Sequence, residues 1–184
     1  MNRLRYFVLS LSVLCVVAKQ ADASQVAQIE RNRDLILNTH LKKYRELGDC
    51  MIEASALFSV PEWMIYAIVY HERGPVHGAL VNKSNGTRDW GPTGINDVRL
   101  IDYSDMGVRI TGPQISKNPC IGIRMTGHLL RKEYDKLGTS EKSWLTAAGN
   151  YHYNKKGTYP HNHYKYIGHI KDSLRRFQKT IEEK

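Results

Sequence analysis

Apolar residues near the end of the chain recur at intervals of three and four over fifteen residues, and this pattern constrains the fold more than any other. The spacing puts them on one face of an α-helix, and a helix with such a face must bury it against other elements. The pattern therefore predicts a long terminal helix packed on a helical domain. The residues are Ile167, Ile170, Leu174, Phe177 and Ile181.

Helix-start signals and weaker helical spacing occur in the rest of the chain. Ser59-Val60-Pro61-Glu62 matches a capping box with proline in the first turn, and Asp49 is placed to cap the preceding helix. The predicted class is mainly α. Helices are expected in one or two segments within 25–47, at 49–58, from about 61 to 72, at 120–137 and at 141–149.

Residues 82–119 contain the turn formers that separate regular elements, including Asn85-Gly86 and several further glycines. We expect an irregular loop or a short hairpin here. Loops this long usually build a site or are disordered. The apolar residues within the segment favour an ordered loop; they are Trp90, Ile95, Leu100 and Ile101.

The first 23 residues have the form of an export signal. Arg3 and Arg5 precede the apolar run 7–18, and Ala21-Asp22-Ala23 matches the A-x-A cleavage pattern. We expect cleavage after this signal, with the mature protein periplasmic or secreted. No later segment has the length and apolarity for stable membrane insertion. The predicted organisation is a signal peptide at 1–23, a helical extension at 24–48 and a domain at 49–184.

Export would bring the two remaining cysteines, Cys50 and Cys120, into an oxidising compartment, where an even count favours a disulfide over two buried free thiols. The net charge is +9, and removal of residues 1–23 (three positive charges, one negative) leaves about +7. Such a charge favours anionic or densely polar partners. An exported protein seldom meets nucleic acid, so cell-wall polymers or a membrane surface are expected instead.

An apolar helix that ends on His71-Glu72-Arg73 holds the main candidate for chemistry. Glu72 falls on the stripe formed by Ile65, Ile68 and Val69, so it is predicted to point inward rather than into solvent. The negative end of the helix dipole and partial burial would both raise its pKa. A glutamic acid that is protonated near neutral pH can act as a general acid. The alternative is a solvated helix end.

Four features occur in a fixed order: the helix ending in His71-Glu72-Arg73-Gly74, the loop SNGTRDWGPTGIND at 84–97, Asn118-Pro119-Cys120, and AAGNYHY at 147–153. This order resembles the lytic transglycosylases of the soluble goose-lysozyme-like superfamily. It is most similar to the small exported members that accompany conjugation, type IV and type III secretion, and pilus assembly. The resemblance covers about residues 49–170 and implies a lysozyme-like fold with a long loop or short hairpin at the active-site cleft.

The family's catalytic glutamate falls on Glu72, but the serine that usually follows is replaced by Arg73. In the D-x-G-L-M-Q-I-N loop, matched by residues 89–96, the Asp, Gly, Ile and Asn are kept, whereas Pro92, Thr93 and Gly94 depart from the pattern. These departures put substrate contacts in doubt more than chemistry. A cysteine pair like Cys50 and Cys120 also recurs in the family. The implied substrate-binding residues are Gly91, Thr93, Gly94, Ile95, Asn96, Tyr151 and His152.

The resemblance implies cleavage of the β-1,4 bond between N-acetylmuramic acid and N-acetylglucosamine in peptidoglycan. Glu72 would protonate the leaving oxygen and then, as a carboxylate, take the proton of the muramic acid 6-hydroxyl as a 1,6-anhydro ring closes. Tyr151 would lie across from Glu72, its hydroxyl bonding the carboxyl or the substrate N-acetyl group; the alternative is a buried ring with a satisfied hydroxyl. No cofactor and no metal is expected. The implied partners are glycan strands and a secretion, conjugation or pilus apparatus.

Two other functions are compatible with these residues. A lysozyme-type hydrolase would need a second carboxylate, with Asp89 more typical of a loop cap. A wall-binding or scaffold subunit could keep the fold without turnover. The histidines at 152, 161, 163 and 169 are interpreted as solvated or core residues rather than metal ligands. The candidates for a second carboxylate are Asp89, Asp97, Asp102 and Asp105.

Overall fold

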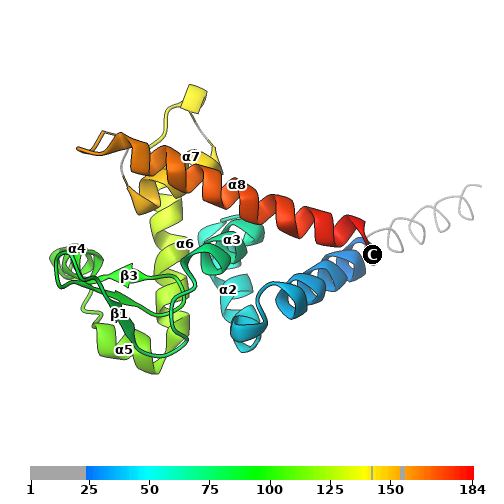
Figure 1. Ribbon diagram of the computed structural model, residues 1–184, viewed down its shortest axis with the longest axis horizontal. Coiled ribbons are helices and arrows are strands. Elements are labelled where there is room, and N and C mark those ends of the chain that lie inside the picture. Colours follow the sequence, from blue (N-terminus) through cyan, green and yellow to red (C-terminus); the bar gives the residue numbers. More distant parts are fainter. Residues whose placement is uncertain (1–23, 142, 154–155) are drawn as a thin grey trace, which may run out of the picture.

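A computed structural model of the protein describes residues 24–141, 143–153 and 156–184. The predicted signal peptide at 1–23 lies outside these residues. The fold is mainly α, as predicted, with a small sheet beside the helices (Figure 1). Residues 24–39 are helical and precede the short 3₁₀ helix η1 (Lys42–Leu47). The other helices are α2 (Gly48–Phe58), α3 (Glu62–Glu72), α4 (Asp97–Asp105), α5 (Gly112–Lys117), α6 (Pro119–Asp135), η2 (Thr139–Glu141), α7 (Trp144–His152) and α8 (Pro160–Glu182).

Helix α6 runs through the middle of the molecule and contacts α2, α3, α5 and α7 (Figure 1). Ile123 and Leu130 on α6 are fully buried. Helix α3 is buried on almost every side, as expected for a helix that is hydrophobic all round. Across the described residues, no helix is both long enough and apolar enough to traverse a bilayer.

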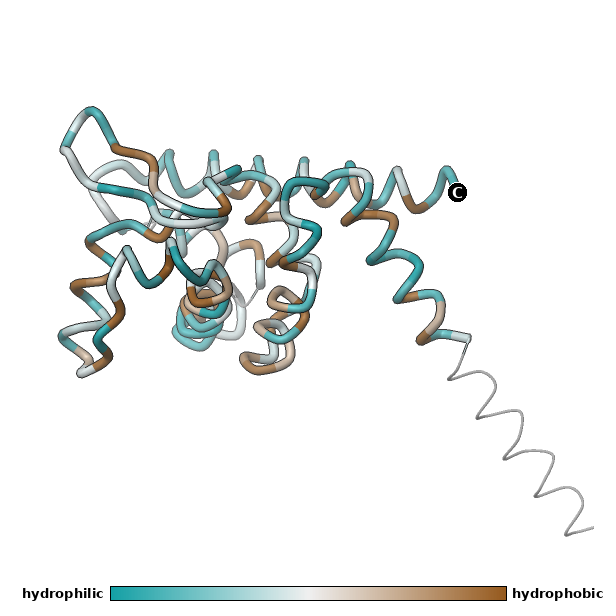
Figure 2. The backbone as a smooth tube through the Cα atoms, turned by 90° about the horizontal axis from the view of Figure 1, so that it is seen from below, coloured by the Kyte–Doolittle hydropathy of each residue, from teal (hydrophilic) through white to brown (hydrophobic). Residues whose placement is uncertain are grey.

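Helix α8 confirms the terminal stripe, since Ile170 and Phe177 are buried, Leu174 and Ile181 pack partly buried against the core, and Ile167 is half-buried. Figure 2 shows hydrophobic stretches recurring along the C-terminal helix between hydrophilic ones. The stripe reaches the N-terminal helical segment, where His40 Nε2 lies 2.8 Å from Thr180 Oγ1. The first and last helical segments therefore meet on one side of the molecule.

The segment before α2 contributes to the same hydrophobic core as the rest of the chain. Ile36, Leu41 and Tyr44 are buried in it. The hydroxyl of Tyr44 donates to the carbonyl of Gly74 at 2.7 Å, just beyond the end of α3. This segment thus supports the turn that follows Glu72.

The start of α3 differs from the prediction, because Ser59 does not cap it. Ser59 adopts a left-handed conformation (φ 51°) as the C-cap of α2, so the predicted capping box was wrong. Glu62 instead forms a two-pronged ion pair with Arg33, whose Nη2 lies 2.6 Å from Oε2. Asp49 lies in the first turn of α2 rather than at its N-cap, which is Leu47.

The predicted loop at 82–119 is more regular than expected. Strands β1 (Ala79–Val81), β2 (Arg88–Trp90) and β3 (Ile95–Asn96) form an antiparallel sheet, which confirms the hairpin. Helices α4 and α5 were missed. Asn96 caps α4 by accepting from the Val98 amide at 3.0 Å, and Thr111 begins α5 with a capping box. Ile101 does not fill the core, since it is 60% exposed.

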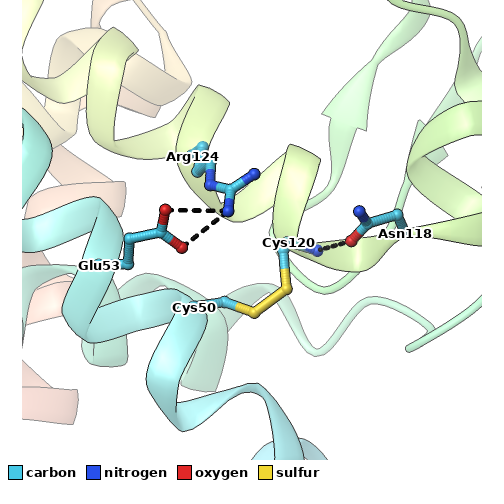
Figure 3. Close-up of a disulfide and its surroundings, with 5 residues drawn as sticks. All are labelled: Cys50, Glu53, Asn118, Cys120 and Arg124. Carbon is cyan, nitrogen blue, oxygen red and sulfur yellow. Dashed lines mark hydrogen bonds and ion pairs between the residues drawn. A yellow bond between two sulfur atoms is a disulfide. The ribbon is translucent and has the colours of Figure 1, made fainter.

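The predicted disulfide between Cys50 and Cys120 is present and joins α2 to the first turn of α6 (Figure 3). Its Cα atoms are 5.3 Å apart, and the residues are separated by 70 positions in sequence. Beside it, Asn118 caps α6 by accepting from the Cys120 amide at 3.2 Å. Arg124 and Glu53 form an ion pair between the same two helices, with Nη2 and Oε2 2.7 Å apart. Several interactions therefore fix α2 against α6.

Candidate active site

A cleft of about 760 Å³ collects most of the predicted site residues. Its lining comes from the sheet and α4 on one side and from α7 and the start of α8 on the other. In Figure 1 the sheet and α4 lie below α7 and α8. Gly91 and Thr93 do not line it. The predicted residues that do are Glu72, Gly94, Ile95, Asn96, Tyr151 and His152.

Glu72 is the last residue of α3, and its mostly buried carboxyl opens onto this cleft. Its pKa is raised to about 7, mainly by loss of hydration on burial and in smaller part by the nearby charge of Asp89. A hydrogen bond from Tyr166 acts in the opposite direction because it stabilises the charged form. The inward orientation and the raised pKa both agree with the prediction. Glu72 can therefore hold its proton close to neutral pH.

Tyr166 is the partner of this carboxyl, and its role was missed from the sequence. Its hydroxyl donates to Glu72 Oε1 at 2.6 Å. Its ring is almost fully buried, stacks on His152 (centroids 4.3 Å, planes 4° apart) and meets His71 edge-on at 5.1 Å. A signal did exist: Tyr166 lies four residues before Ile170 on the buried stripe, and a buried tyrosine hydroxyl needs a partner.

The hydroxyl of Tyr151 does not bond the carboxyl, which was the first of the two roles predicted for it. It donates to the carbonyl of Thr93 at 3.0 Å and lies 3.4 Å from Thr126 Oγ1. Tyr151 is buried, with 8% of its surface exposed. Burial raises the pKa of this phenol, so it stays neutral. The alternative interpretation, a buried ring with a satisfied hydroxyl, describes its contacts better.

The loop at 91–94 folds closely around the end of α3. The amide of Gly74 donates to the carbonyl of Pro92 at 3.3 Å, and a Cβ at Gly74 would collide with the carbonyl of Gly91. Thr93 is fully buried and donates to the carbonyl of Gly122 at 3.3 Å. Gly91 and Thr93 thus hold the loop in place and do not line the cleft, although both were predicted as substrate contacts.

Gly94 is the member of this loop that lies nearest the carboxyl. A Cβ placed on it would lie 3.4 Å from Glu72 Oε2. Its φ of 62° is left-handed, a conformation that glycine adopts without steric cost. The resemblance led us to expect glutamine here, and glycine instead places no side chain beside Oε2.

The polar residues of the sheet are largely occupied with one another. Asp89 Oδ1 accepts from Asn96 Nδ2 at 2.7 Å. Asp97 accepts from the Arg88 amide at 2.9 Å and from Trp90 Nε1 at 2.6 Å. Of the four aspartates weighed as a second carboxylate, Asp89 alone lines the cleft. Its bond to Asn96 agrees with its interpretation as a structural residue.

The histidines near Glu72 form a stacked group rather than a ligand set. His71 stacks on His169 with centroids 4.6 Å apart, and burial lowers the pKa of His71 to about 4, helped by His169 and His152. Burial also lowers the pKa of His152, and His163 is buried against the Tyr153 carbonyl. Within the part of the chain that the structure describes, no group of three or more His, Cys, Asp or Glu residues could hold a metal ion.

Arg73 follows Glu72 at the position where the resemblance led us to expect serine. It is the C-cap of α3 in a left-handed conformation, with φ 52°. Its guanidinium lies over the Tyr70 ring at 5.3 Å, and its Nε donates to the Tyr70 carbonyl at 3.3 Å. The side chain is therefore directed back along α3 and does not line the cleft.

Comparison with known proteins gives distant relatives. No protein-family model matches the chain. The chain is 28% identical to Invasion protein IagB of Salmonella typhimurium strain SL1344 over 83 residues, which are 45% of this chain and 51% of IagB. It is 25% identical to Protein IpgF of Shigella flexneri over 136 residues, which are 74% of this chain and 84% of IpgF. The chain thus spans about half the length of IagB, and it is distantly related to a protein named for invasion.

Proposed function

We propose that the protein is a peptidoglycan lytic transglycosylase. The single observation that carries this proposal is the carboxyl of Glu72, which is held in a cleft with a pKa of about 7 and accepts a hydrogen bond from Tyr166. A general acid works best when its pKa lies near the working pH. The cleft is within the size range of small-ligand and substrate sites.

In this proposal the two oxygens of the carboxyl have different tasks, and their contacts support the assignment. Tyr166 donates to Oε1, so Oε1 acts as an acceptor and the proton of the neutral acid sits on Oε2. Oε2 is the oxygen nearer to Gly94, and both Glu72 and Gly94 line the cleft. In the proposed reaction Oε2 gives its proton to the leaving glycosidic oxygen. The resulting carboxylate then accepts the proton of the muramic acid 6-hydroxyl. The oxygen of that hydroxyl bonds C1 of the same sugar and closes the 1,6-anhydro ring.

A hydrolase is the second candidate, because Asp89 lines the same cleft and raises the pKa of Glu72. A carboxylate in that position could act on water or on the sugar. Its side chain is already bonded to Asn96, which favours the transglycosylase. Neither reaction needs nucleic acid, metal or cofactor.

The products distinguish these functions. Purified sacculi treated with the protein should release muropeptides that end in 1,6-anhydro-N-acetylmuramic acid, as measured by mass spectrometry. Reducing ends without the anhydro ring would identify the hydrolase instead. The Glu72→Gln variant keeps the shape of the side chain but has no acidic proton, so it should release neither product. If the wild type binds the wall but releases no products, the protein would instead be a scaffold subunit.

The place of action is part of the same proposal. The export-signal pattern at 1–23 supports a periplasmic or secreted protein. The distant similarity to an invasion protein supports service to an envelope-spanning secretion, conjugation or pilus apparatus, for which the enzyme would open the wall locally. Fractionation of cells should find the processed chain outside the cytoplasm.

A further inference from the structure

We infer that the stacked rings of His71 and His169 hold Tyr166 in place only while both rings are uncharged. Tyr166 in turn bonds the carboxyl of Glu72, so the two histidines are positioning residues for the proposed acid. This inference rests on the proposed function and adds an acid limit to the working range of the same site. Neither histidine is among the described residues that line the cleft, so neither contacts substrate in the proposed complex.

Two contacts join the same parts of α3 and α8. His71 directly precedes Glu72 at the end of α3, and His169 follows Tyr166 by three positions on α8, which is less than one helical turn. The rings of His71 and His169 stack with centroids 4.6 Å apart and planes 18° apart. The hydroxyl of Tyr166 donates to Glu72 Oε1 at 2.6 Å. A change in the spacing of the two histidines therefore also changes the spacing of the tyrosine and the carboxyl.

The ring of Tyr166 is enclosed by histidines from two helices. His71 meets it edge-on, with centroids 5.1 Å apart and planes 82° apart. His152 on α7 stacks on it with centroids 4.3 Å apart. Tyr166 is 2% exposed, and its hydroxyl has Glu72 as a hydrogen-bond partner. The position of this hydroxyl is therefore set by the packing of the surrounding rings.

Burial and neighbouring cations both oppose a positive charge on His71. Burial lowers its pKa to about 4, helped by the charges of His169, His152 and Arg73. Because the two rings are stacked, protonation of both would place two positive charges 4.6 Å apart on different helices. Their repulsion would separate α3 from α8 at the point where Tyr166 reaches the carboxyl.

The acidic groups around the pair are engaged with other partners. On α8, Asp172 forms an ion pair with Arg175, with Oδ1 and Nη1 3.3 Å apart. In the sheet, Asp89 is hydrogen-bonded to a neighbouring side chain. Burial lowers the pKa of His152 as well, and Arg99 adds to this effect while Asp89 opposes it. A positive charge on the stacked pair is therefore not neutralised by a nearby carboxylate.

The consequence is a loss of activity in acid that Glu72 alone would not cause. With a pKa of about 7, Glu72 is already protonated in mild acid, so a reaction that begins with its proton should not slow as the pH falls further. Protonation of the stacked histidines would slow the reaction by releasing Tyr166 from Oε1. The site would then work between the pH at which the histidines lose their charge and the pH at which Glu72 ionises.

The test replaces a histidine with a ring that cannot take up a proton. Nuclear Overhauser effects between the Tyr166 ring and the Glu72 side chain report their contact and are followed from pH 6 to pH 3. In the wild type they should be lost near the His71 pKa of about 4, whereas His71→Phe should keep them. Muropeptide release should fall about tenfold from pH 5 to pH 3 in the wild type and stay constant in His71→Phe.

His128→Phe is the matched control. His128 also has a pKa lowered by burial, but its ring packs against Phe58 and Tyr103 rather than against Tyr166. This variant should lose activity in acid as the wild type does. If circular dichroism shows that His71→Phe is not folded, His169→Phe makes the same test from the other ring and should likewise remove the loss.

The outcomes separate this inference from the proposed function. A wild type that keeps the contact at pH 3, or a variant without the stacked pair that loses it as the wild type does, would overturn the inference even if anhydro products are released at neutral pH. Unfolding of wild type and His71→Phe alike at pH 3 would count against it in the same way. A loss confined to proteins that retain both stacked histidines supports it. That result without anhydro products would refute the transglycosylase while leaving the acid-sensitive pair intact.

Discussion

The pairing of Glu72 with Tyr166 sets the acid strength of the site at the scale of single residues. Burial raises the pKa of the carboxyl, whereas the hydroxyl of Tyr166 lowers it by bonding the charged form. The balance leaves the pKa at about 7. The direction of the burial effect could be predicted from the stripe that Glu72 shares with Ile65 and Val69. The contribution of Tyr166 could not, because it requires α8 to pack against α3 across a sequence separation of 94 positions.

Tyr166→Phe tests this balance. The variant keeps the ring that stacks on His152 but removes the hydrogen bond to Oε1, so the pKa of Glu72 should rise above its wild-type value. The alkaline limb of the pH–rate profile should therefore move to higher pH, while turnover at the optimum falls by about tenfold or more because the carboxyl is no longer oriented. Muropeptide release measured across pH checks both. An unmoved alkaline limb would mean that the bond does not tune Glu72.

At the scale of elements, the loop between β2 and β3 brings backbone up to the carboxyl. Gly94→Ala should cost about 1 kcal/mol in stability through its left-handed φ and should also place a methyl group 3.4 Å from Oε2. We expect muropeptide release to fall at least tenfold, on the order of the loss from one misplaced substrate contact. Gly107→Ala is the matched control, since Gly107 has a φ of 81° and open space around it. The control should lose similar stability in denaturant but keep its activity; equal losses of activity would contradict the role of Gly94.

Most elements could be predicted from the sequence, and the errors have physical causes. The period of Ile167, Ile170 and Phe177 identified α8 because a buried face imposes it. Ser59 was assigned to the start of α3 because serine is a common helix N-cap. In the structure its left-handed φ makes it the C-cap of α2 instead. Helices α4 and α5 were missed because they are short and lie between glycines, although Thr111 to Gln114 carries a readable capping box.

The placement of site residues depended on contacts that sequence order does not contain. The motif order correctly predicted that Gly94, Asn96 and His152 would share a cleft with Glu72. Whether a loop residue faces the cleft or the core depends on the turn geometry, and this turned Thr93 inward.

At the scale of the whole molecule, the disulfide holds α2 against α6 across 70 positions. A protein with both Cys50→Ser and Cys120→Ser should lose about 4 kcal/mol of unfolding free energy in the chain-entropy model. Denaturant unfolding of the oxidised wild type and the variant measures the difference. At low temperature the variant should still release muropeptides, because the ion pair of Arg124 and Glu53 joins the same helices. Unchanged stability would show that the bridge adds nothing to these contacts.

The stability of the whole fold should also depend on the protonation of Glu72. Its folded pKa of about 7 lies above the ordinary value of 4.5, so its contribution is complete below pH 4.5 and is lost as the pH rises through 7. The loss is on the order of 3 kcal/mol. The pKa of His71 is lowered to about 4, so His71 destabilises the fold as the pH falls below 6.5. The effect of the carboxyl is therefore isolated by comparing the unfolding free energies of the wild type and Glu72→Gln, which share His71. In denaturant unfolding, the free energy of unfolding of the wild type should fall relative to that of Glu72→Gln as the pH rises from 5 to 8. A difference between the two proteins that stays constant over this range would refute the burial effect.

The most direct measurement of the central claim is the titration of the Glu72 side-chain carboxyl by carbon-13 NMR, with Glu72→Gln used to assign its signal. The account predicts a midpoint near pH 7, well above the ordinary value of 4.5. A midpoint near 4.5 would contradict it, because the carboxyl would then be ionised at neutral pH and could not donate a proton to the glycosidic oxygen.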